Sequence, residues 1–247
     1  MTIRNGRHID RYIPRDLEDM FYRNPNPKAK YARHNGYDPY AIPTSGLVLY
    51  APLWALKGDV LTTIDGYQHT GTVDGADWRY NGRTFGGSAS KITIPSHASL
   101  NMTTALTLIA WVYHDLANSE FMIAKQIADI AYSLYTDGSD KLILRIDVSS
   151  AKKSVVSTNT VGAGAWKNCA GVYNKTDLRV YQNGELDCTP VAQTGDIDVT
   201  TDDVTIGWGI ENTYGWDGTI GEVMIYNRAL SAGEIAHIYN VTKWRYF

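Results

Sequence analysis

Residues 85–113 read FGGSASKITIPSHASLNMTTALTLIAWVY and carry the clearest structural signal in this chain of 247 residues. Lys91–Ile94 alternates polar and apolar residues, and Pro95 interrupts the alternation. Residues 106–113 are almost entirely apolar and centre on Trp111. A period of two and an enrichment in β-branched residues are typical of β-strands, so we predict two strands joined by a polar turn.

The composition favours an all-β protein with many turns. The chain has 17 tyrosines, seven tryptophans and 22 glycines, and few of its segments have the 3.6-residue period of a helix. A chain of this length can bury roughly 70% of its unfolded surface, which is enough for one stable sandwich core.

Further strands are predicted at short spacing on both sides of this stretch. Their ranges are 47–53, 121–124, 131–136, 141–148, 153–158, 165–173, 178–182, 204–206 and 218–226. Turn formers separate them, and Asn183-Gly184 is the clearest case because both residues accept the positive φ of a type I′ hairpin turn. The glycine-rich residues 57–82 show no clear period.

One short helix is predicted near the C-terminus. Ser231 and Glu234 have the spacing of a capping box, and Ile235, Ile238 and Tyr239 then share one face.

The two cysteines, Cys169 and Cys188, fall in consecutive predicted hairpins. In that register Cys188 lies opposite Arg179, whose other neighbour is about Val172, so the two sulfur atoms are too far apart for a disulfide. Two free thiols are expected.

Together these motifs closely resemble the laminin-G-like, concanavalin A-like family of jelly-roll domains. The matching residues are Phe85, Gly87, Ile94, Leu100, Thr107 and Trp111 at the start, Trp166 with residues 170–173 in the middle, Tyr181 and residues 183–185 at the hairpin, and Ile206, Gly207 and residues 218–231 at the end. The resemblance covers about residues 46–243. It implies an all-β, two-sheet antiparallel jelly-roll sandwich.

The first 44 residues differ from the rest of the chain. They hold five of the eight prolines and eight basic against five acidic residues, whereas the remainder has 15 basic and 21 acidic residues. We therefore divide the chain into an extended anchoring arm, residues 1–44, and a jelly-roll domain, residues 45–247. The arm would bind partner subunits or, alternatively, wrap back on its own sandwich. Its expected contact residues are Tyr12, Phe21, Tyr22, Tyr31, Tyr37 and Tyr40.

Several partner classes are not indicated by the sequence. The net charge is −3 and no block of lysine and arginine exceeds two residues, so no nucleic-acid partner is predicted. The longest apolar run has about eight residues, against the ~20 that a membrane-spanning helix needs. Residues 1–20 lack the apolar segment of a secretory signal.

The resembled family includes glucanases, which carry a Glu-x-Asp-x-x-Glu strand. Only Glu185-Leu186-Asp187 begins this pattern, and Pro190 stands in the third position. No catalytic residue is predicted, and the chain is expected not to be an enzyme.

A calcium ion is the only cofactor that the resemblance raises. Asp65 and Glu222 are the candidate ligands, but Gly221 stands where relatives have an aspartate, and hard cations want six or more oxygens. No cofactor is therefore predicted, and Asp65 is expected to cap a turn.

The resemblance also implies that rim loops could bind sugars. Trp208, Asn212 and Tyr214 lie in one aromatic loop, and Tyr67 and His69 lie in a second loop that we expect to be close by. The sequence therefore predicts a glycan site from these five residues. Core positions are expected for Trp111, Trp166 and Trp216.

These observations, with the family resemblance, favour a non-enzymatic virion structural or display protein, such as a capsid decoration, vertex or tail component of a bacteriophage. The arm would bind other virion subunits or further copies of this chain, and the sandwich would face outward toward host surface glycans. The expected location is the virion, after assembly in the host cytoplasm. The alternative is an extracellular carbohydrate-binding module or adhesin outside any particle.

Overall fold

A computed structural model describes residues 42–87, 90–115, 118–126, 130–209 and 215–247. The six aromatic residues of the predicted arm, together with Asn212 and Tyr214, lie outside these residues. The chain divides into two units, Met1–Pro39 and Tyr40–Phe247. All the described residues belong to the second unit.

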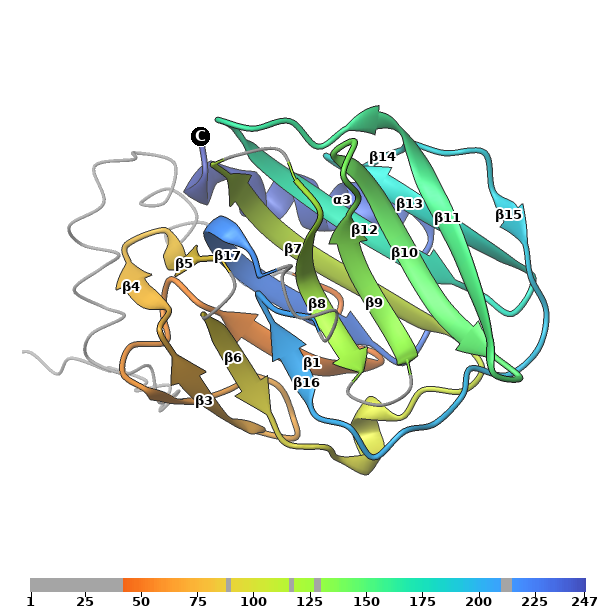
Figure 1. Cartoon of the computed structure of the whole chain (residues 1–247), viewed down its shortest axis with the longest axis horizontal. Helices are drawn as coiled ribbons and strands as arrows, with labels where there is room; N and C mark the ends of the chain where they lie inside the picture. The colour runs from red at the N-terminus through yellow and green to blue at the C-terminus, as the bar shows by residue number, and fades with distance from the viewer. Residues whose placement is uncertain (1–41, 88–89, 116–117, 127–129, 210–214) are drawn as a thin grey trace, which may run out of the picture. The chain divides into compact units, whose positions relative to one another are not determined.

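The described residues form two antiparallel sheets (Figure 1). Sheet A contains β1 (Leu47–Pro52), β4 (Asp77–Arg79), β5 (Gly82–Gly86), β7 (Leu106–His114), β12 (Trp166–Tyr173), β13 (Asp177–Gln182), β14 (Glu185–Leu186), β15 (Val191–Ala192) and β17 (Asp217–Tyr226). Its order is β14-β13-β12-β7-β17-β5-β4, with β1 also paired to β17 and β15 to β13.

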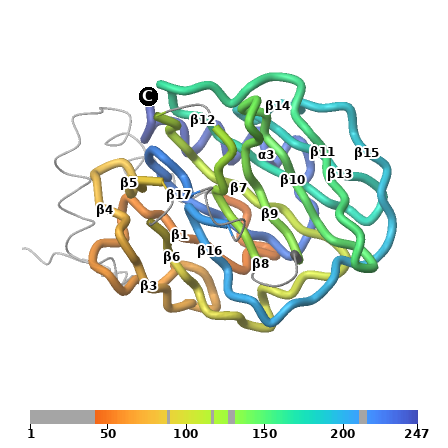
Figure 2. Tube along the Cα trace, viewed as in Figure 1, coloured from red at the N-terminus to blue at the C-terminus, as the bar shows by residue number. Residues whose placement is uncertain are grey.

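Sheet B contains β2 (Val60–Thr62), β3 (Thr70–Asp74), β6 (Lys91–Ile94), β8 (Glu120–Gln126), β9 (Ile130–Thr136), β10 (Lys141–Val148), β11 (Ala151–Thr160) and β16 (Val204–Ile206). Its order is β11-β10-β9-β8-β16-β6-β3-β2. The chain passes from one sheet to the other several times, for example between β7 and β8, as the trace in Figure 2 shows. This is the predicted jelly-roll sandwich.

The main hydrophobic core lies between the two sheets. The strand that opens the family motif, Lys91–Ile94, forms as predicted, and its apolar residues Ile92 and Ile94 are fully buried in this core. In β7, Leu106, Leu108, Ala110 and Val112 join the same core. Because successive side chains of a strand point to opposite faces of the sheet, the alternate apolar residues of these strands face the interior of the sandwich.

A second hydrophobic cluster covers the outer face of sheet A. Helix α3 (Ala232–Thr242) begins with the predicted capping box between Ser231 and Glu234, and it buries Ile235 and Ile238. Ile109 on β7 contributes to this cluster from the outer face of the sheet. Strand β7 is thus covered on both faces, which explains its continuous apolar run. Ile42, near the end of the predicted arm, is also buried here.

The predicted hairpin and the cysteine geometry are confirmed. Asn183 and Gly184 have φ values of 51° and 84°, as a type I′ turn requires. Val172 pairs with Arg179, and both cysteines are free.

Several short strands were not predicted. β2, β3 and β4 lie within residues 57–82, and β5 begins at the end of that range. These strands have three to five residues each, and neighbouring strands rather than local sequence determine their pairing. In the part of the chain that the structure describes, no helix is long and apolar enough to span a membrane.

Candidate functional site

The pairing of β3 with β6 brings two loops that are distant in sequence to the same end of these two strands in sheet B. Because the strands are antiparallel, with Thr72 opposite Thr93, residues before β3 lie beside residues after β6. Tyr67 and His69 precede β3. They meet residues of the 3₁₀ turn η1 (Ala98–Leu100) and its preceding residue His97.

Three rings and one hydroxyl group form a cluster at this end of the strands, which we call the aromatic rim: Tyr67, His69, His97 and Ser99. The rings of Tyr67 and His69 stack with centroids 5.6 Å apart and an interplanar angle of 12°. His97 meets both rings edge-on, at 5.8 and 5.1 Å. Tyr67 is 49% exposed whereas His69 is buried, so one face of Tyr67 rests on the protein. The remaining surface of Tyr67 is available to a ligand.

Ser99 connects the two histidines. Its Oγ lies 2.8 Å from Nδ1 of His97 and 3.2 Å from Nε2 of His69. The backbone N–H of Ser99 also donates to Nδ1 of His97. Because that nitrogen accepts, the remaining ring proton of His97 must sit on Nε2. The exposed His97 therefore presents an N–H donor that Ser99 does not use.

Asp65 orders the loop that carries Tyr67. Its Oδ1 accepts from the backbone N–H groups of Tyr67 at 2.8 Å and Gln68 at 3.1 Å, and its Oδ2 accepts from the N–H of Tyr50 at 3.0 Å. These bonds support the positive φ of 53° at Gln68. The carboxylate thus caps a turn, and the loop is held in place without a ligand.

Glu222 lies elsewhere, in a buried ion pair. Arg245 donates to its two carboxylate oxygens at 3.0 and 3.2 Å, and the Tyr50 hydroxyl donates to Oε2 at 2.8 Å. Asp65 binds the backbone N–H of Tyr50 whereas Glu222 binds its hydroxyl, so the two carboxylates lie at opposite ends of that residue.

The surroundings of Glu222 also offer no room for a further side-chain ligand at position 221. A Cβ atom on Gly221 would lie 2.4 Å from the ring of Tyr246. Among the described residues no group of three His, Cys, Asp or Glu side chains could hold a metal ion. The residues present therefore do not assemble a calcium site, and Arg245 supplies the positive charge beside Glu222.

Trp208 lies at the other end of β6. Ile206 pairs with Ile92, so the chain reaches Trp208 beyond Lys91, and the Lys91 Nζ lies 5.1 Å from the Trp208 ring. Trp208 therefore does not lie close to Tyr67 and His69, as we had expected, because the length of β6 separates them. Of the three residues of the predicted sugar site that the structure describes, Tyr67 and His69 are brought together and Trp208 is not. His97 and Ser99 were missed, because their spacing matches no ligand motif.

The three tryptophans expected in the core differ in burial. Trp111 and Trp216 are fully buried as expected, but Trp166 is only partly buried. Its ring lies at the margin of sheet A, edge-on to Tyr113 and tilted against Tyr246.

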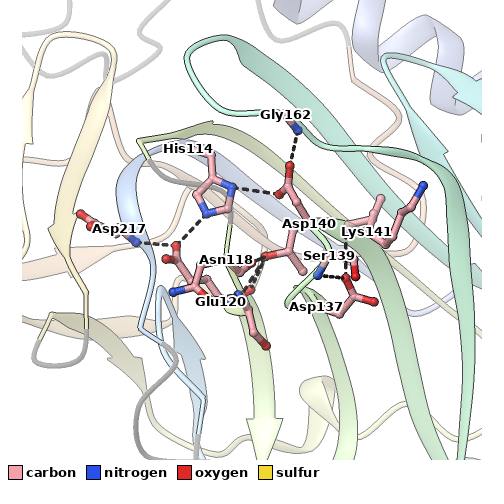
Figure 3. A network of polar contacts seen from close by, with 12 residues as sticks. His114, Asn118, Glu120, Asp137, Ser139, Asp140, Lys141, Gly162 and Asp217 are labelled. Atoms are coloured by element: carbon pink, nitrogen blue, oxygen red, sulfur yellow. Dashed lines mark hydrogen bonds and ion pairs between the residues drawn. The ribbon is translucent and has the colours of Figure 1, made fainter.

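A buried polar network surrounds His114 (Figure 3). His114 contacts a carboxylate through each ring nitrogen: Nε2 lies 3.0 Å from Glu120 and Nδ1 lies 3.2 Å from Asp140. The Trp216 ring stacks on the imidazole with a centroid distance of 4.5 Å. No short motif joins these three polar residues, so the network could not be predicted from the sequence.

The network ties loops together at one end of the sandwich. Glu120 accepts from the Asp217 N–H, and Asp140 accepts from the Gly162 N–H, both at 2.6 Å. A neutral imidazole can donate to only one of the two carboxylates, so the second contact needs another proton within the trio. The side chains of His114, Glu120 and Asp140 are 0%, 5% and 6% exposed. The network is closed to a large substrate and acts as a structural brace.

The family described as the concanavalin A-like lectin/glucanases superfamily, of the laminin G type, matches residues 85–236, which is more than half of the chain. The chain belongs to this family. The predicted fold family is thereby confirmed. No curated protein sequence matches the chain.

Solved structures with the same fold include bacterial toxins and a trypanosomal enzyme. Botulinum neurotoxin type C aligns with a TM-score of 0.62 and 12% identity over 80% of this chain and 51% of the toxin chain. The binding domain of botulinum neurotoxin type D, in complex with N-acetylneuraminic acid, aligns with a TM-score of 0.63 and 15% identity over 79% of this chain and 50% of the toxin chain. Trypanosoma rangeli sialidase aligns with a TM-score of 0.60 and 19% identity over 81% of this chain and 33% of the sialidase chain. The chain spans about half of the toxin chains and a third of the sialidase.

Proposed function

We propose that this chain is a non-enzymatic, lectin-like module that binds glycans at the aromatic rim. The observation that carries the proposal is the Tyr67 ring, which lies flat on His69 in a loop already ordered by Asp65. A rigid tyrosine with one exposed face gives a large contact area at low entropic cost, and nearby polar groups fix the orientation of the ligand. His97 and Ser99 supply such polar groups.

Two of the structural relatives favour glycans as the ligand class. Botulinum neurotoxin type C depends on two ganglioside molecules to enter cells, and the type D domain binds N-acetylneuraminic acid. The likeness to these proteins is one of fold, at 12–15% identity. Sialylated oligosaccharides are therefore the first probes to use, beside neutral ones.

Three of the four glutamates that the structure describes have structural roles, and the fourth, Glu185, is exposed next to the Asn183-Gly184 turn, which supports binding rather than hydrolysis. Glu120 and Glu222 are buried and hydrogen-bonded within the protein. Glu234 forms the capping box and an ion pair with Arg228. Glycoside hydrolysis needs two carboxyl groups that flank an accessible bond. The carboxylates of Glu120, Glu222 and Glu234 serve the fold instead.

Glycan binding can be tested with one substitution and a matched control. Tyr67→Ala should weaken binding to a sialylated or neutral oligosaccharide array by about tenfold, the equivalent of about 1.4 kcal/mol for a lost aromatic contact. Tyr80→Ala is the control, because Tyr80 is 77% exposed on a different loop. Equal loss of binding in both variants, or binding to no glycan by the unmodified chain, would contradict the proposal.

We also propose that residues 1–44 fasten this module to a larger assembly, with a virion as the expected setting. Both sheets and both hydrophobic clusters are formed by residues from Ile42 onward. In this proposal the mildly basic, proline-rich arm with its six aromatic residues binds virion subunits or further copies of this chain. The display of a glycan-binding body on a particle would follow from this arrangement.

The attachment role is tested by deleting residues 1–40, which keeps Ile42 in its cluster. The truncated chain should keep its glycan binding and its unfolding temperature, but it should no longer copurify with the particle that carries the full-length chain. Copurification at the full-length level would contradict the attachment role and favour a free carbohydrate-binding module or adhesin.

A further inference from the structure

We propose that Lys125 and Tyr132 are positioning residues for the aromatic rim. Both side chains are rooted in the core of the sandwich and hold the segment of residues 96–100 by its two ends. The inference rests on the proposed glycan-binding function, because it explains why this segment is held so firmly.

Lys125 lies on the core face of β8. Its cross-strand neighbours are Val204 and Tyr132, which are both fully buried in the main core. Side chains of directly opposite residues share one face of a sheet, so the lysine chain runs through the same core. Lys125 itself is 0% exposed. Its ammonium group ends at Ser96, two residues after the end of β6.

The ammonium group of Lys125 holds Ser96, the residue before His97. Lys125 Nζ donates to Ser96 Oγ at 3.1 Å and to the backbone carbonyl of Asp202. The backbone N–H of Ser96 donates to Oδ1 of Asp203 at 2.8 Å. Ser96 is therefore fixed through both its side chain and its backbone.

Tyr132 holds the other end of the segment. It lies on the core face of β9, and its hydroxyl donates to the backbone carbonyl of Leu100 at 3.1 Å. Leu100 is the last residue of η1 and is itself buried. Lys125 and Tyr132 thus bracket His97 and Ser99, the two rim residues that this segment contributes.

The hydrogen bonds within residues 96–100 determine the local conformation of the turn, but they do not determine its position relative to the core. Ser99 donates to the His97 ring, and the Leu100 N–H donates to the His97 carbonyl, so these bonds join residues of the same turn. The contact between Ser99 Oγ and His69 connects the turn to the opposite loop. The contacts to Lys125 and Tyr132 fix the turn relative to the core, beside the buried Leu100 side chain and the bond from the Ser96 N–H to Asp203.

Burial of these polar groups works against stability. Burial lowers the pKa of the Lys125 ammonium, although Asp202 and Asp203 oppose the shift, and burial raises the pKa of the Tyr132 hydroxyl. Taking a charge out of water is unfavourable unless good partners compensate, and an apolar side chain of similar length avoids that penalty. Placement of the rim is a role that an apolar side chain at these positions could not fulfil.

The test uses Lys125→Met and Tyr132→Phe in the full-length chain. Three quantities are measured: the unfolding temperature, the amide hydrogen exchange of Ser99 and Leu100, and binding to a sialylated ganglioside oligosaccharide. We expect Lys125→Met to keep or raise the unfolding temperature. In both variants, exchange at Ser99 and Leu100 should become at least tenfold faster, and binding should weaken about tenfold.

Two controls remove similar contacts that do not involve residues 96–100. Tyr173→Phe removes a core hydroxyl that donates to the Gly195 carbonyl, and Lys141→Met removes a lysine that donates to the Thr158 carbonyl. Neither control should change exchange at Ser99. Tyr132→Phe removes a single oxygen atom and keeps the ring, so it carries the test alone if Lys125→Met does not fold.

Each outcome decides between the alternatives. If both variants fold and leave exchange at Ser99 and glycan binding unchanged, the positioning role is overturned. A lowered unfolding temperature with unchanged binding would likewise show that the two residues serve the core alone. If the unmodified chain binds no glycan while exchange at Ser99 still accelerates, the proposed function fails but the mechanical coupling stands.

Discussion

Arg245 reaches back from the C-terminal turn and donates to both carboxylate oxygens of Glu222 in the middle of β17, at 3.0 and 3.2 Å. Both side chains are almost fully buried, so this ion pair connects the end of the described chain to the centre of sheet A. Glu222 stands directly opposite Trp111, on which the ring of Tyr246 stacks. The ion pair therefore holds the C-terminal turn against the outer face of sheet A.

Breaking this pair should destabilise the fold strongly. Glu222→Gln leaves the Arg245 guanidinium buried beside a neutral amide, and loss of one partner of a buried pair typically costs about 3 kcal/mol. Urea unfolding monitored by tryptophan fluorescence measures the loss. Asp77→Asn is the control, because the Asp77–Arg79 pair is exposed and should contribute less than about 0.5 kcal/mol. A loss of similar size in both variants would contradict the assignment.

The capping box of α3 should make the stability depend on acid pH. The Arg228 guanidinium and the Ser231 N–H lower the pKa of Glu234 from 4.5 to about 2. A folded-state pKa below the unfolded one stabilises the fold above pH 4.5, and this contribution is lost as the pH falls from 4.5 to 2.

Glu234→Gln tests this dependence. Because the pair is partly exposed, the contribution is reduced by solvent screening to about 1 kcal/mol. The variant should be less stable at pH 6, and its stability should change less between pH 4.5 and pH 2. The free energy of unfolding of both proteins is measured between pH 6 and pH 2. If the two stability curves run parallel over this range, the account is contradicted.

The buried brace around His114 should control exchange in the loops that it joins. His114→Gln removes the imidazole from between Glu120 and Asp140, which should cost about 2–3 kcal/mol for buried carboxylates left with poorer partners. The amides of Asp217 and Gly162 should then exchange faster with solvent. Asp115→Asn is the neighbouring control, because Asp115 is exposed. Unchanged exchange at both amides would show that the loops do not depend on the brace.

The tight turn between β10 and β11 offers a stabilising substitution. Ser149 and Ser150 have φ values of 52° and 58°, which non-glycine residues adopt reluctantly, and Asp198 accepts from both N–H groups. Ser150→Gly should raise the free energy of unfolding by about 0.5–1 kcal/mol. The same change at Ser139, whose φ is not positive, should lower it slightly. A destabilising effect of Ser150→Gly would contradict the strain at this turn.

Much of the fold could be predicted from local patterns. The strand Lys91–Ile94, the hairpin at Asn183-Gly184 and the capping box at Ser231 depend on alternation, on positive φ and on side-chain capping, all of which are readable within a few residues. Strands β2, β3 and β4 could not be read in this way, because partners from distant parts of the chain determine their conformation.

The candidate site was predictable only in part. Tyr67 and His69 stood out as an aromatic pair in a loop, and Asp65 was expected to cap their turn. His97 and Ser99 could not be found, because only the antiparallel pairing of β3 with β6 brings them to the same end of these strands. A different pairing, that of β16 with β6, places Trp208 at the far end of β6, which alternation alone does not reveal.

The most direct measurement is an NMR titration of the isotope-labelled full-length chain with a sialylated ganglioside oligosaccharide. The account predicts saturable shifts of the Tyr67 ring and of the His97 ring and Ser99 amide signals, with the Trp208 indole signal unchanged. Shifts confined to Trp208, or no shift at any signal across sialylated and neutral oligosaccharides, would contradict glycan binding at the aromatic rim.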